Sequence, residues 1–305
     1  MTDEILISGL DASVNFVRHL PGGRGAFEAR YVSRKDEYFI VYLSSHAGCD
    51  KACRMCHLTQ MGQTDMTPAT LEDYLSQARR VMMHYAELEH DGRPPADYVN
   101  FNFMARGEPF ANPIVLSAFP VLDNDLRQIA ADAGIGRAQL NLSTIMPLEI
   151  AGRDLKEIIG PNRRGVNVYY SLYSMDKDFR KRWLPKAMDP MIALTMLAEW
   201  QMSGEGGEVV LHWPFIAGAN DSEEDVEKII RAVRMVGLKT RFNLVRYNPF
   251  SAAQGVESDG IIMRRNLRLL GDAFGDPRTQ IVPRVGGDVK ASCGMFVNDG
   301  EPALA

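Results

Sequence analysis

Three cysteines lie within eight residues of this 305-residue chain, at Cys49, Cys53 and Cys56. One further cysteine, Cys293, lies near the other end of the sequence. Soft thiolate ligands bind iron–sulfur clusters and zinc, so a C-x3-C-x2-C group could hold either kind of centre. Three thiolates would bind three irons of a four-iron cluster and leave the fourth iron free to chelate a small molecule. Cys293 is then a second candidate for chemistry.

Zinc is the alternative interpretation of the cysteine group. Zinc sites usually combine one C-x2-4-C pair with a second pair of cysteines or histidines, and that second pair is missing here. His46, His57 or Cys293 could still complete a tetrahedron, so these residues alone leave zinc open. The chain would then be a zinc-stabilised interaction module without catalytic activity. A disulfide framework is not favoured, because a chain of this length with four cysteines does not need covalent cross-links.

The composition favours a globular protein with a large core. Hydrophobic residues make up 46% of the chain, and no apolar run is long enough to span a bilayer. The first seven residues lack the basic start and apolar stretch of a signal peptide. We therefore expect a cytoplasmic protein with reduced cysteines and no membrane partner. The formal net charge of −5 does not favour strong non-specific binding of nucleic acid, so RNA contact would need a local basic face.

Strand and helix patterns alternate along the chain. Helix starts are predicted at Thr67-Pro68, for a helix to about Leu88, and at Ser222, for a helix that ends at Gly237. Strands separated by helices pair in parallel, because each helix is a crossover. Six such units are fewer than the eight of a closed barrel, which predicts an α/β fold with a partial (β/α)6 TIM-like barrel. The predicted strands are 38–43, 98–104, 138–143, 166–172, 209–213 and 240–247.

The predicted barrel places the cysteine group at its functional end. Active sites of such barrels form at the C-terminal ends of the strands, and the cysteines directly follow the first predicted strand. We expect residues 26–297 to form the barrel. Residues 1–25 are expected to form a short N-terminal extension and residues 298–305 a C-terminal tail.

Short stretches of this sequence resemble radical S-adenosylmethionine (SAM) enzymes, and more narrowly the RlmN/Cfr family of RNA adenosine methyltransferases. The order and spacing of the stretches, between about Phe27 and Phe296, agree with that family. They are Ser44–Cys49 with the cysteine group, Gly107–Pro109, Leu142–Thr144, Ser171–Ser174, Ala219–Asp221, Tyr247–Phe250, Gly287–Asp288 and Ala291–Gly294.

The resemblance implies a radical SAM methyltransferase with a [4Fe-4S] cluster and S-adenosyl-L-methionine as cofactors. Cys49, Cys53 and Cys56 would bind the cluster. The substrate would be an adenosine carbon in rRNA or tRNA, and the electron donor a flavodoxin or ferredoxin. A protein, peptide or small metabolite is the alternative substrate on the same scaffold, favoured by the acidic charge.

Residues at the ends of the predicted strands become candidate SAM contacts through this resemblance. Glu108, within Gly107-Glu108-Pro109, could accept hydrogen bonds from the SAM ammonium, and a strand-to-loop turn is the alternative role of this stretch. Ser143 and Thr144 could contact the SAM carboxylate or ribose, and helix capping is their alternative role.

Three further positions have paired interpretations. Ser171 has the same two readings as Ser143 and Thr144. Asn248 could bind the adenosyl group or form a turn before Pro249. Met55, where the family usually has an aromatic residue, could pack against adenine or belong to the core.

The resemblance also assigns roles to Cys293 and Tyr42. In the family, one SAM methylates a cysteine near the C-terminus, a second SAM yields the radical that removes hydrogen from this methyl group, and the carbon radical adds to adenine. Cys293 matches the methyl-carrying cysteine. The family releases its product through a second cysteine, seven residues before the first cluster ligand, where this chain has Tyr42. A tyrosine forms no disulfide, although its phenol could act as acid, base or radical relay.

Two features of the chain bear on RNA binding. The family's N-terminal RNA-binding domain would be absent or reduced to about 25 residues. Three basic groups are candidate phosphate contacts, and exposed solvated faces are the alternative, which we favour for the last. They are Arg163-Arg164, Arg180 to Lys186 and Arg264 to Arg268.

Overall fold

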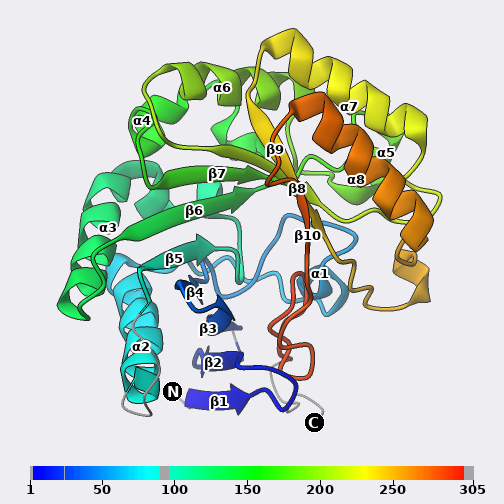
Figure 1. Cartoon of the computed structure of the whole chain (residues 1–305). Coiled ribbons are helices and arrows are strands. Elements are labelled where there is room, and N and C mark those ends of the chain that lie inside the picture. The colour runs from blue at the N-terminus through cyan, green and yellow to red at the C-terminus, as the bar shows by residue number, and fades with distance from the viewer. Residues whose placement is uncertain (1–2, 24, 90–95, 299–305) are drawn as a thin grey trace.

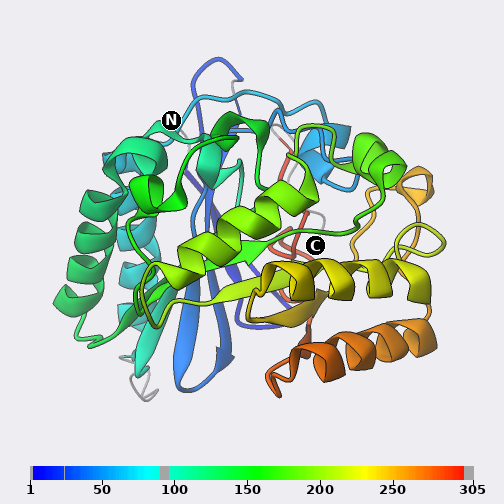
Figure 2. The same ribbon diagram turned by 90° about the horizontal axis from the view of Figure 1, so that it is seen from above.

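The computed structural model describes residues 3–23, 25–89 and 96–298. One mixed sheet of ten strands runs in the order β1 to β10, and helices cover its outer face (Figure 1). Seen from above, the sheet curves around an interior that the helices surround on one side (Figure 2). The sheet is open, with β1 and β10 at its two edges. None of the described helices is long and apolar enough to cross a membrane.

The parallel part of the sheet confirms the predicted barrel strands. All six occur with small differences at their ends, and a seventh, β10, follows them. The strands are β4 (Tyr38–Tyr42), β5 (Tyr98–Phe103), β6 (Ala138–Thr144), β7 (Val166–Tyr170), β8 (Val209–Trp213), β9 (Thr240–Val245) and β10 (Gln280–Val282). β10 was missed because three residues carry too little pattern to be read as a strand.

Three antiparallel strands precede the barrel and were also missed. β1 (Asp3–Ile7) and β2 (Val14–His19) lie within the predicted extension, and β3 (Ala26–Lys35) joins them to β4. β3 buries the charged residues Glu28 and Arg30. Because these charges interrupt the apolar pattern, the strand has no clear sequence signal.

Crossover helices pack on the outside of the barrel. They are α2 (Leu71–Glu89), α3 (Pro113–Asp132), α4 (Leu155–Ile159), α6 (Pro190–Met202), α7 (Glu223–Val236) and α8 (Gly260–Phe274), with the shorter α1 (His57–Gln60) and α5 (Lys177–Trp183) in loops. Single 3-10 turns are η1 (Pro109–Ala111), η2 (Leu148–Ile150) and η3 (Ala252–Gln254). The predicted caps of α7 are confirmed: the Ser222 side chain accepts from Asp225 N, and Gly237 ends the helix in the left-handed conformation.

The predicted start of α2 is wrong by about one turn. Thr67 N and Oγ1 both donate to the Asp65 carboxylate, at 2.7 and 2.6 Å, which holds Thr67 in a turn before the helix. Thr70 begins α2 instead: its Oγ1 accepts from Asp73 N, and the Asp73 carboxylate accepts from Thr70 N. This reciprocal pair is a capping box.

The two faces of the barrel strands have opposite polarity. On β5, Val99, Phe101 and Phe103 are fully buried under the helices. The alternate residues Tyr98, Asn100 and Asn102 face the interior and line a cavity. Successive side chains of a strand point to opposite faces, so the apolar core lies outside the sheet and a polar space lies within it.

Candidate functional site

The cysteine group lies in the loop between β4 and α1, at the C-terminal end of the first parallel strand. Backbone hydrogen bonds join Cys49 N to Gln63 O and Cys56 N to Cys53 O, both at 3.0 Å. A Cβ at Gly48 would lie 2.5 Å from the Gln63 carbonyl oxygen, so only glycine fits there. Backbone packing therefore fixes the path of the loop that carries the three cysteines.

The three thiols influence one another's ionisation. Burial, with the charge of Cys56, raises the pKa of Cys49 to about 12. Burial also raises the pKa of Cys56 to about 11. For Cys53, burial and both neighbouring cysteines raise the pKa well above its ordinary value. Three thiolates can share this site only beside positive charge, so the donor set fits a metal centre that binds thiolate sulfur.

The arrangement of possible metal ligands bears on the zinc alternative. Across residues 3–23, 25–89 and 96–298, no group of three or more histidine, cysteine, aspartate or glutamate side chains is placed to hold a metal ion. A zinc site gathers four ligands around a single ion. The described side chains do not form a four-ligand site of this kind.

Gly107 and Glu108 follow β5 and reach back to the cysteine loop. Gly107 has a φ of 90°, and a Cβ there would lie 2.6 Å from Nδ1 of His46, so the backbone approaches as closely as expected. The buried Glu108 carboxylate accepts hydrogen bonds from Phe110 N and Ile145 N, both at 3.1 Å. Burial raises its pKa to about 7 against the effect of these bonds. The backbone thus engages both oxygens, and a contact to SAM stays a prediction.

A cavity of about 600 Å³ occupies the interior of the barrel. Five of the predicted site residues line it: Tyr42, Ser143, Ser171, Asn248 and Cys293. Tyr42 belongs to β4 and Ser143 to β6, whereas Ser171, Asn248 and Cys293 follow β7, β9 and β10 in that order. The fold therefore brings together residues from five separate parts of the chain.

His212 joins two of these residues and had no assigned role in the sequence. The Oγ atoms of Ser143 and Ser171 each lie 2.9 Å from Nε2 of His212, at the end of β8. The ring is buried. One imidazole thus fixes both serine side chains at the cavity wall. This contact could not be predicted from the sequence, because it depends on the alignment of β6, β7 and β8 in the sheet.

The burial of His212 predicts a pH-dependent stability. Burial lowers its pKa to about 4, whereas the unfolded chain has the ordinary value of about 6.5. Its contribution is fully present above pH 6.5 and is lost as the pH falls towards 4, by about 3 kcal/mol in total. Denaturant unfolding between pH 7 and 4 measures this loss. His212→Gln should lose stability less steeply over this range, and an equal slope in both proteins would contradict the assignment.

Other predicted residues lie outside the cavity. Gly107, Glu108, Pro109, Thr144 and Met55 do not line it. Thr144 is buried, and its Oγ1 accepts from the N–H two residues later, at 2.7 Å, which forms a turn in the loop after β6 and does not cap a helix. Met55 is buried in the hydrophobic core, the second of its two predicted roles.

One predicted phosphate contact is wrong. Arg180 is buried, and its guanidinium donates to the carbonyl oxygens of Leu172 and Met188, both at 2.8 Å. Arg163 is likewise engaged, by Asp123 at 3.0 Å. These arginines stabilise loops of the fold. Arg164, in contrast, lines the cavity.

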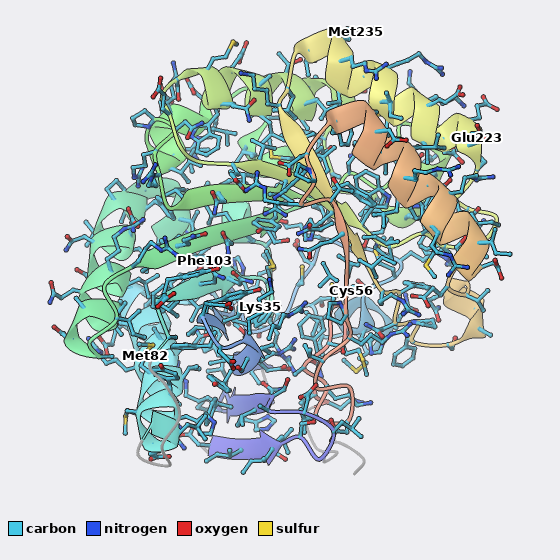
Figure 3. All side chains as sticks on the ribbon, in the orientation of Figure 1. Lys35, Cys56, Met82, Phe103, Glu223 and Met235 are labelled. Carbon is cyan, nitrogen blue, oxygen red and sulfur yellow. The ribbon has the colours of Figure 1, made fainter. Side chains whose placement is uncertain are left out.

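Cys293 lies beside the cysteine loop. His57 N, directly after Cys56, donates to Gly294 O at 3.1 Å, and Asn248 Nδ2 donates to Cys293 O at 2.9 Å. Figure 3 shows Cys56 next to the segment that descends from β10. The fourth cysteine is therefore placed between the cavity and the candidate cluster site.

The environment of the Cys293 thiol is mixed. Its side chain is exposed to the cavity. The surrounding protein raises the pKa of the thiol, and the guanidinium groups of Arg30 and Arg34 oppose this rise. These two arginines would stabilise a thiolate at Cys293.

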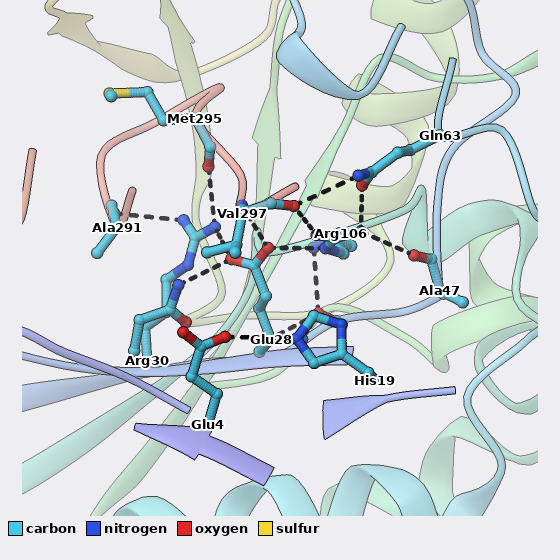
Figure 4. Close-up of polar contacts among 12 residues, drawn as sticks. Glu4, His19, Glu28, Arg30, Ala47, Gln63, Arg106, Ala291, Met295 and Val297 are labelled. Atoms are coloured by element: carbon cyan, nitrogen blue, oxygen red, sulfur yellow. Dashed lines mark hydrogen bonds and ion pairs between the residues drawn. The ribbon is translucent and has the colours of Figure 1, made fainter. Parts of the chain in front are cut away.

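A buried ion network ties the Cys293 segment to the sheet (Figure 4). Glu28 lies between two arginines: Arg106 Nε donates to Oε1 at 2.7 Å and Arg30 donates to Oε2 at 2.5 Å. All three side chains are at most 1% exposed. Although burial raises the pKa of Glu28, the two arginines lower it to about 2. The same arginines donate to backbone carbonyls of the C-terminal segment, at Ala291, Met295 and Val297.

Removing the charge of Glu28 is expected to destabilise the protein. Glu28→Gln leaves Arg30 and Arg106 buried without a counter-charge, which costs about 3–5 kcal/mol. Denaturant unfolding followed by circular dichroism measures the change. Glu224→Gln, which breaks an exposed pair on α7, is the matched control and should have no measurable effect. Equal stability of the two variants would contradict a structural role for the network.

Known proteins resemble this chain over most of its length. No protein-family model matches the chain. A probable dual-specificity RNA methyltransferase RlmN of Salinibacter ruber is 28% identical, over 96% of this chain and 76% of that protein. The dual-specificity RNA methyltransferase RlmN of Paramagnetospirillum magneticum is 26% identical, over 90% of this chain and 57% of that protein. The chain is therefore similar to RlmN-type RNA methyltransferases over most of its length.

A solved structure confirms the fold of this RlmN-like chain. A radical SAM methyltransferase from Sphaerobacter thermophilus matches it with a TM-score of 0.74 at 20% identity, over 96% of this chain and 80% of that one. The partial barrel is therefore confirmed. The cofactors of the family are a [4Fe-4S] cluster and SAM, and the thiol donor set of the cysteine loop fits this cluster. This chain spans about three quarters of the length of the first of these relatives and less than two thirds of the length of the second.

Proposed function

We propose that this chain is a radical SAM methyltransferase that modifies an adenosine carbon in RNA through Cys293. One observation carries the proposal: Cys293 opens onto the cavity that also contains Ser143, Ser171 and Asn248, and its segment is hydrogen-bonded to the residue after Cys56. A methyl-carrying cysteine must lie beside both the cluster and the substrate space. The RlmN relatives support RNA as the substrate.

The proposed roles follow from position. Cys49, Cys53 and Cys56 would bind the cluster, which with SAM supplies a 5′-deoxyadenosyl radical. Ser143 and Ser171, held by His212, would orient SAM from the cavity wall. Glu108, within the Gly107–Pro109 turn, and Thr144 would fix the backbone next to the cluster.

Cys293 would act as the carrier of the methyl group. Its thiol would lose a proton, and its sulfur would take the methyl group from SAM as the sulfur–methyl bond of SAM breaks. Burial raises the pKa of this thiol overall, and Arg30 and Arg34 partly offset that rise. An external electron donor of the flavodoxin or ferredoxin type would reduce the cluster. The reducing cytoplasm is the compartment in which four free cysteines persist.

Mass spectrometry of the Cys293 peptide tests the proposal. Reconstituted enzyme is incubated with reductant, RNA and SAM that carries a deuterated methyl group. We expect a labelled methyl group on Cys293 or a covalent RNA adduct at this residue. A peptide that never carries the label would contradict the proposal.

Tyr42 predicts how the product leaves the enzyme. It lines the cavity together with Cys293, at the position where the family has its second cysteine. Product release from this chain should therefore depend on an added thiol. Tyr42→Cys should release a single product per enzyme without it, because the introduced thiol can form an internal disulfide with Cys293 that an added thiol must reduce before the next turnover. Product per enzyme at increasing dithiothreitol measures this dependence. Tyr42→Phe, the matched control, should gain nothing.

A further inference from the structure

The barrel interior carries polar side chains along its length, together with some apolar ones. Inward-facing side chains of ordinary (β/α) barrels are bulky and apolar and fill the interior. Here the cavity is lined from the first residue of β4, Tyr38, to Cys293 beyond the C-terminal ends of the strands. The intervening inward positions carry amides and hydroxyls, among them Asn100, Asn102, Asn141, Ser143, Asn167 and Asn243. A space of this polarity is suited to a polar ligand.

Most of the amides are already matched to one another. Asn141 Nδ2 donates to Asn102 Oδ1 at 2.7 Å, and Asn167 Nδ2 donates to Asn141 Oδ1 at 2.8 Å. Asn100 differs, because its Oδ1 is buried without a hydrogen-bond partner. A buried acceptor without a partner is costly unless a ligand or water supplies the donor.

The cavity wall is strongly basic in an acidic chain. Eight lysines and arginines line it against a single acidic residue, Glu208. Five of the eight have carboxylate partners: Arg30 with Glu28, Arg241 and Arg278 with Glu208, and Arg246 and Arg284 with Glu257. The other three, Arg34, Lys35 and Arg164, form no ion pair with any described residue. An excess of positive charge around a concave site attracts anions.

A β-bulge places Arg34 in this wall. Ser33 pairs with Phe39 and Lys35 pairs with Tyr38, so Arg34 is the extra residue between two adjacent pairs. A bulge redirects the side chain of its extra residue. Arg34 lines the cavity, and its Nε is buried without a hydrogen-bond partner. The fold therefore directs an unpaired guanidinium into the cavity wall.

The three cations without a carboxylate partner, Arg34, Lys35 and Arg164, lie towards the N-terminal ends of the strands. Lys35 pairs with the first residue of β4, and Arg164 precedes β7. In Figure 3, Lys35 lies towards the side where the barrel strands begin, and Cys56 towards the side where they end. The Arg34 charge still acts on the Cys293 thiol. One ligand could thus reach from these cations to Cys293.

We propose that the end of the barrel interior at Arg34 binds a phosphate group of the substrate nucleotide. Arg34 is the main contact, Lys35 and Arg164 add charge at the opening, and Asn100 accepts a hydrogen bond from the nucleoside. A guanidinium binds phosphate through two parallel hydrogen bonds, which match its fork geometry. The inference rests on the proposed nucleotide substrate and adds how that substrate is oriented: phosphate towards Arg34, base towards Cys293.

Calorimetric titration of the cluster-loaded protein with AMP and with adenosine tests this site. We expect AMP to bind at least about tenfold more tightly, since tenfold corresponds to about 1.4 kcal/mol, the size of one hydrogen bond to a charged group. Arg34→Gln should bring the ratio close to one and leave adenosine binding unchanged. Arg264→Gln, an exposed arginine of α8 outside the cavity, is the matched control. Equal affinities in the wild type, or an unchanged ratio in Arg34→Gln, would overturn the proposal.

Two further measurements keep the test decisive. If Arg34→Gln does not fold, as judged by circular dichroism, Lys35→Gln combined with Arg164→Gln replaces exposed residues and should still lower the AMP-to-adenosine ratio. An unchanged ratio in that variant would likewise overturn the site. Added potassium chloride should weaken AMP binding and leave adenosine binding unaffected. Equal salt dependence for both ligands would contradict a charge-based site.

A parallel binding measurement with RNA distinguishes RNA phosphate from the phosphate of a free mononucleotide. A short RNA with one adenosine that binds more tightly than AMP, and is weakened by Arg34→Gln, assigns the site to RNA phosphate. Weakening of AMP alone assigns it to a free mononucleotide. The proposed function is tested separately, by measuring methylation of Cys293 in the absence of nucleotide. An Arg34-dependent AMP preference without any methyl-Cys293 would retain the phosphate site and remove the methyltransferase.

Discussion

Replacing Cys53 with alanine is expected to abolish iron binding and SAM cleavage. Cys53 is the middle one of the three proposed ligands, and burial and both neighbouring cysteines raise the pKa of its thiol well above the ordinary value. A site of this kind loses its cluster when one of only three thiolates is missing. The expected result is loss of the sulfide-to-iron absorption band and of 5′-deoxyadenosine, to the level of a protein-free control.

Cys293→Ala is the matched control for this loss. It also removes a cysteine near the loop, and it should retain iron and SAM cleavage because the proposed cluster ligands are Cys49, Cys53 and Cys56. Circular dichroism should be unchanged in both variants, since backbone hydrogen bonds define the loop. Full iron content and SAM cleavage in Cys53→Ala would contradict the cluster assignment.

Methyl transfer is expected to disappear completely in Cys293→Ala, although SAM cleavage continues. The alanine offers no sulfur to carry the methyl group, while the cysteine loop and the Ser143–His212–Ser171 contacts remain intact. Methylated nucleoside and 5′-deoxyadenosine, measured in the same reaction, separate the two steps. Of the two cysteine variants, only Cys293→Ala should lose the methylated nucleoside while it still forms 5′-deoxyadenosine.

Ser292→Ala serves as the control for the segment itself. Ser292 Oγ donates to Val285 O at 2.6 Å, so its loss disturbs the same segment without removing the thiol. This variant should keep methyl transfer at a reduced rate. Methylated product from Cys293→Ala would show that the carbon reaches RNA by another route and would remove Cys293 from the mechanism.

The sequence alone determined the local features of this protein. Cys49, Cys53 and Cys56 are recognised by their spacing, because metal ligation depends on residue type and short separation. The barrel strands are recognised because each combines β-prone residues with a flanking helix pattern, and all six were found. The cap at Ser222 is equally local, since the interaction spans three residues.

Only the tertiary structure revealed the contacts that span the chain. His212 fixes Ser143 and Ser171 because three neighbouring strands place their ends together. Glu28 and Arg106 meet across 78 positions, and the charges of Glu28 and Arg30 obscured β3 in the sequence. The contacts of each arginine in the fold decide whether it is available to a ligand. Arg180 donates its hydrogen bonds to backbone carbonyl groups, whereas a bulge directs Arg34 into the cavity. A pattern within one strand holds no information about partners from another strand, which is why these residues were missed.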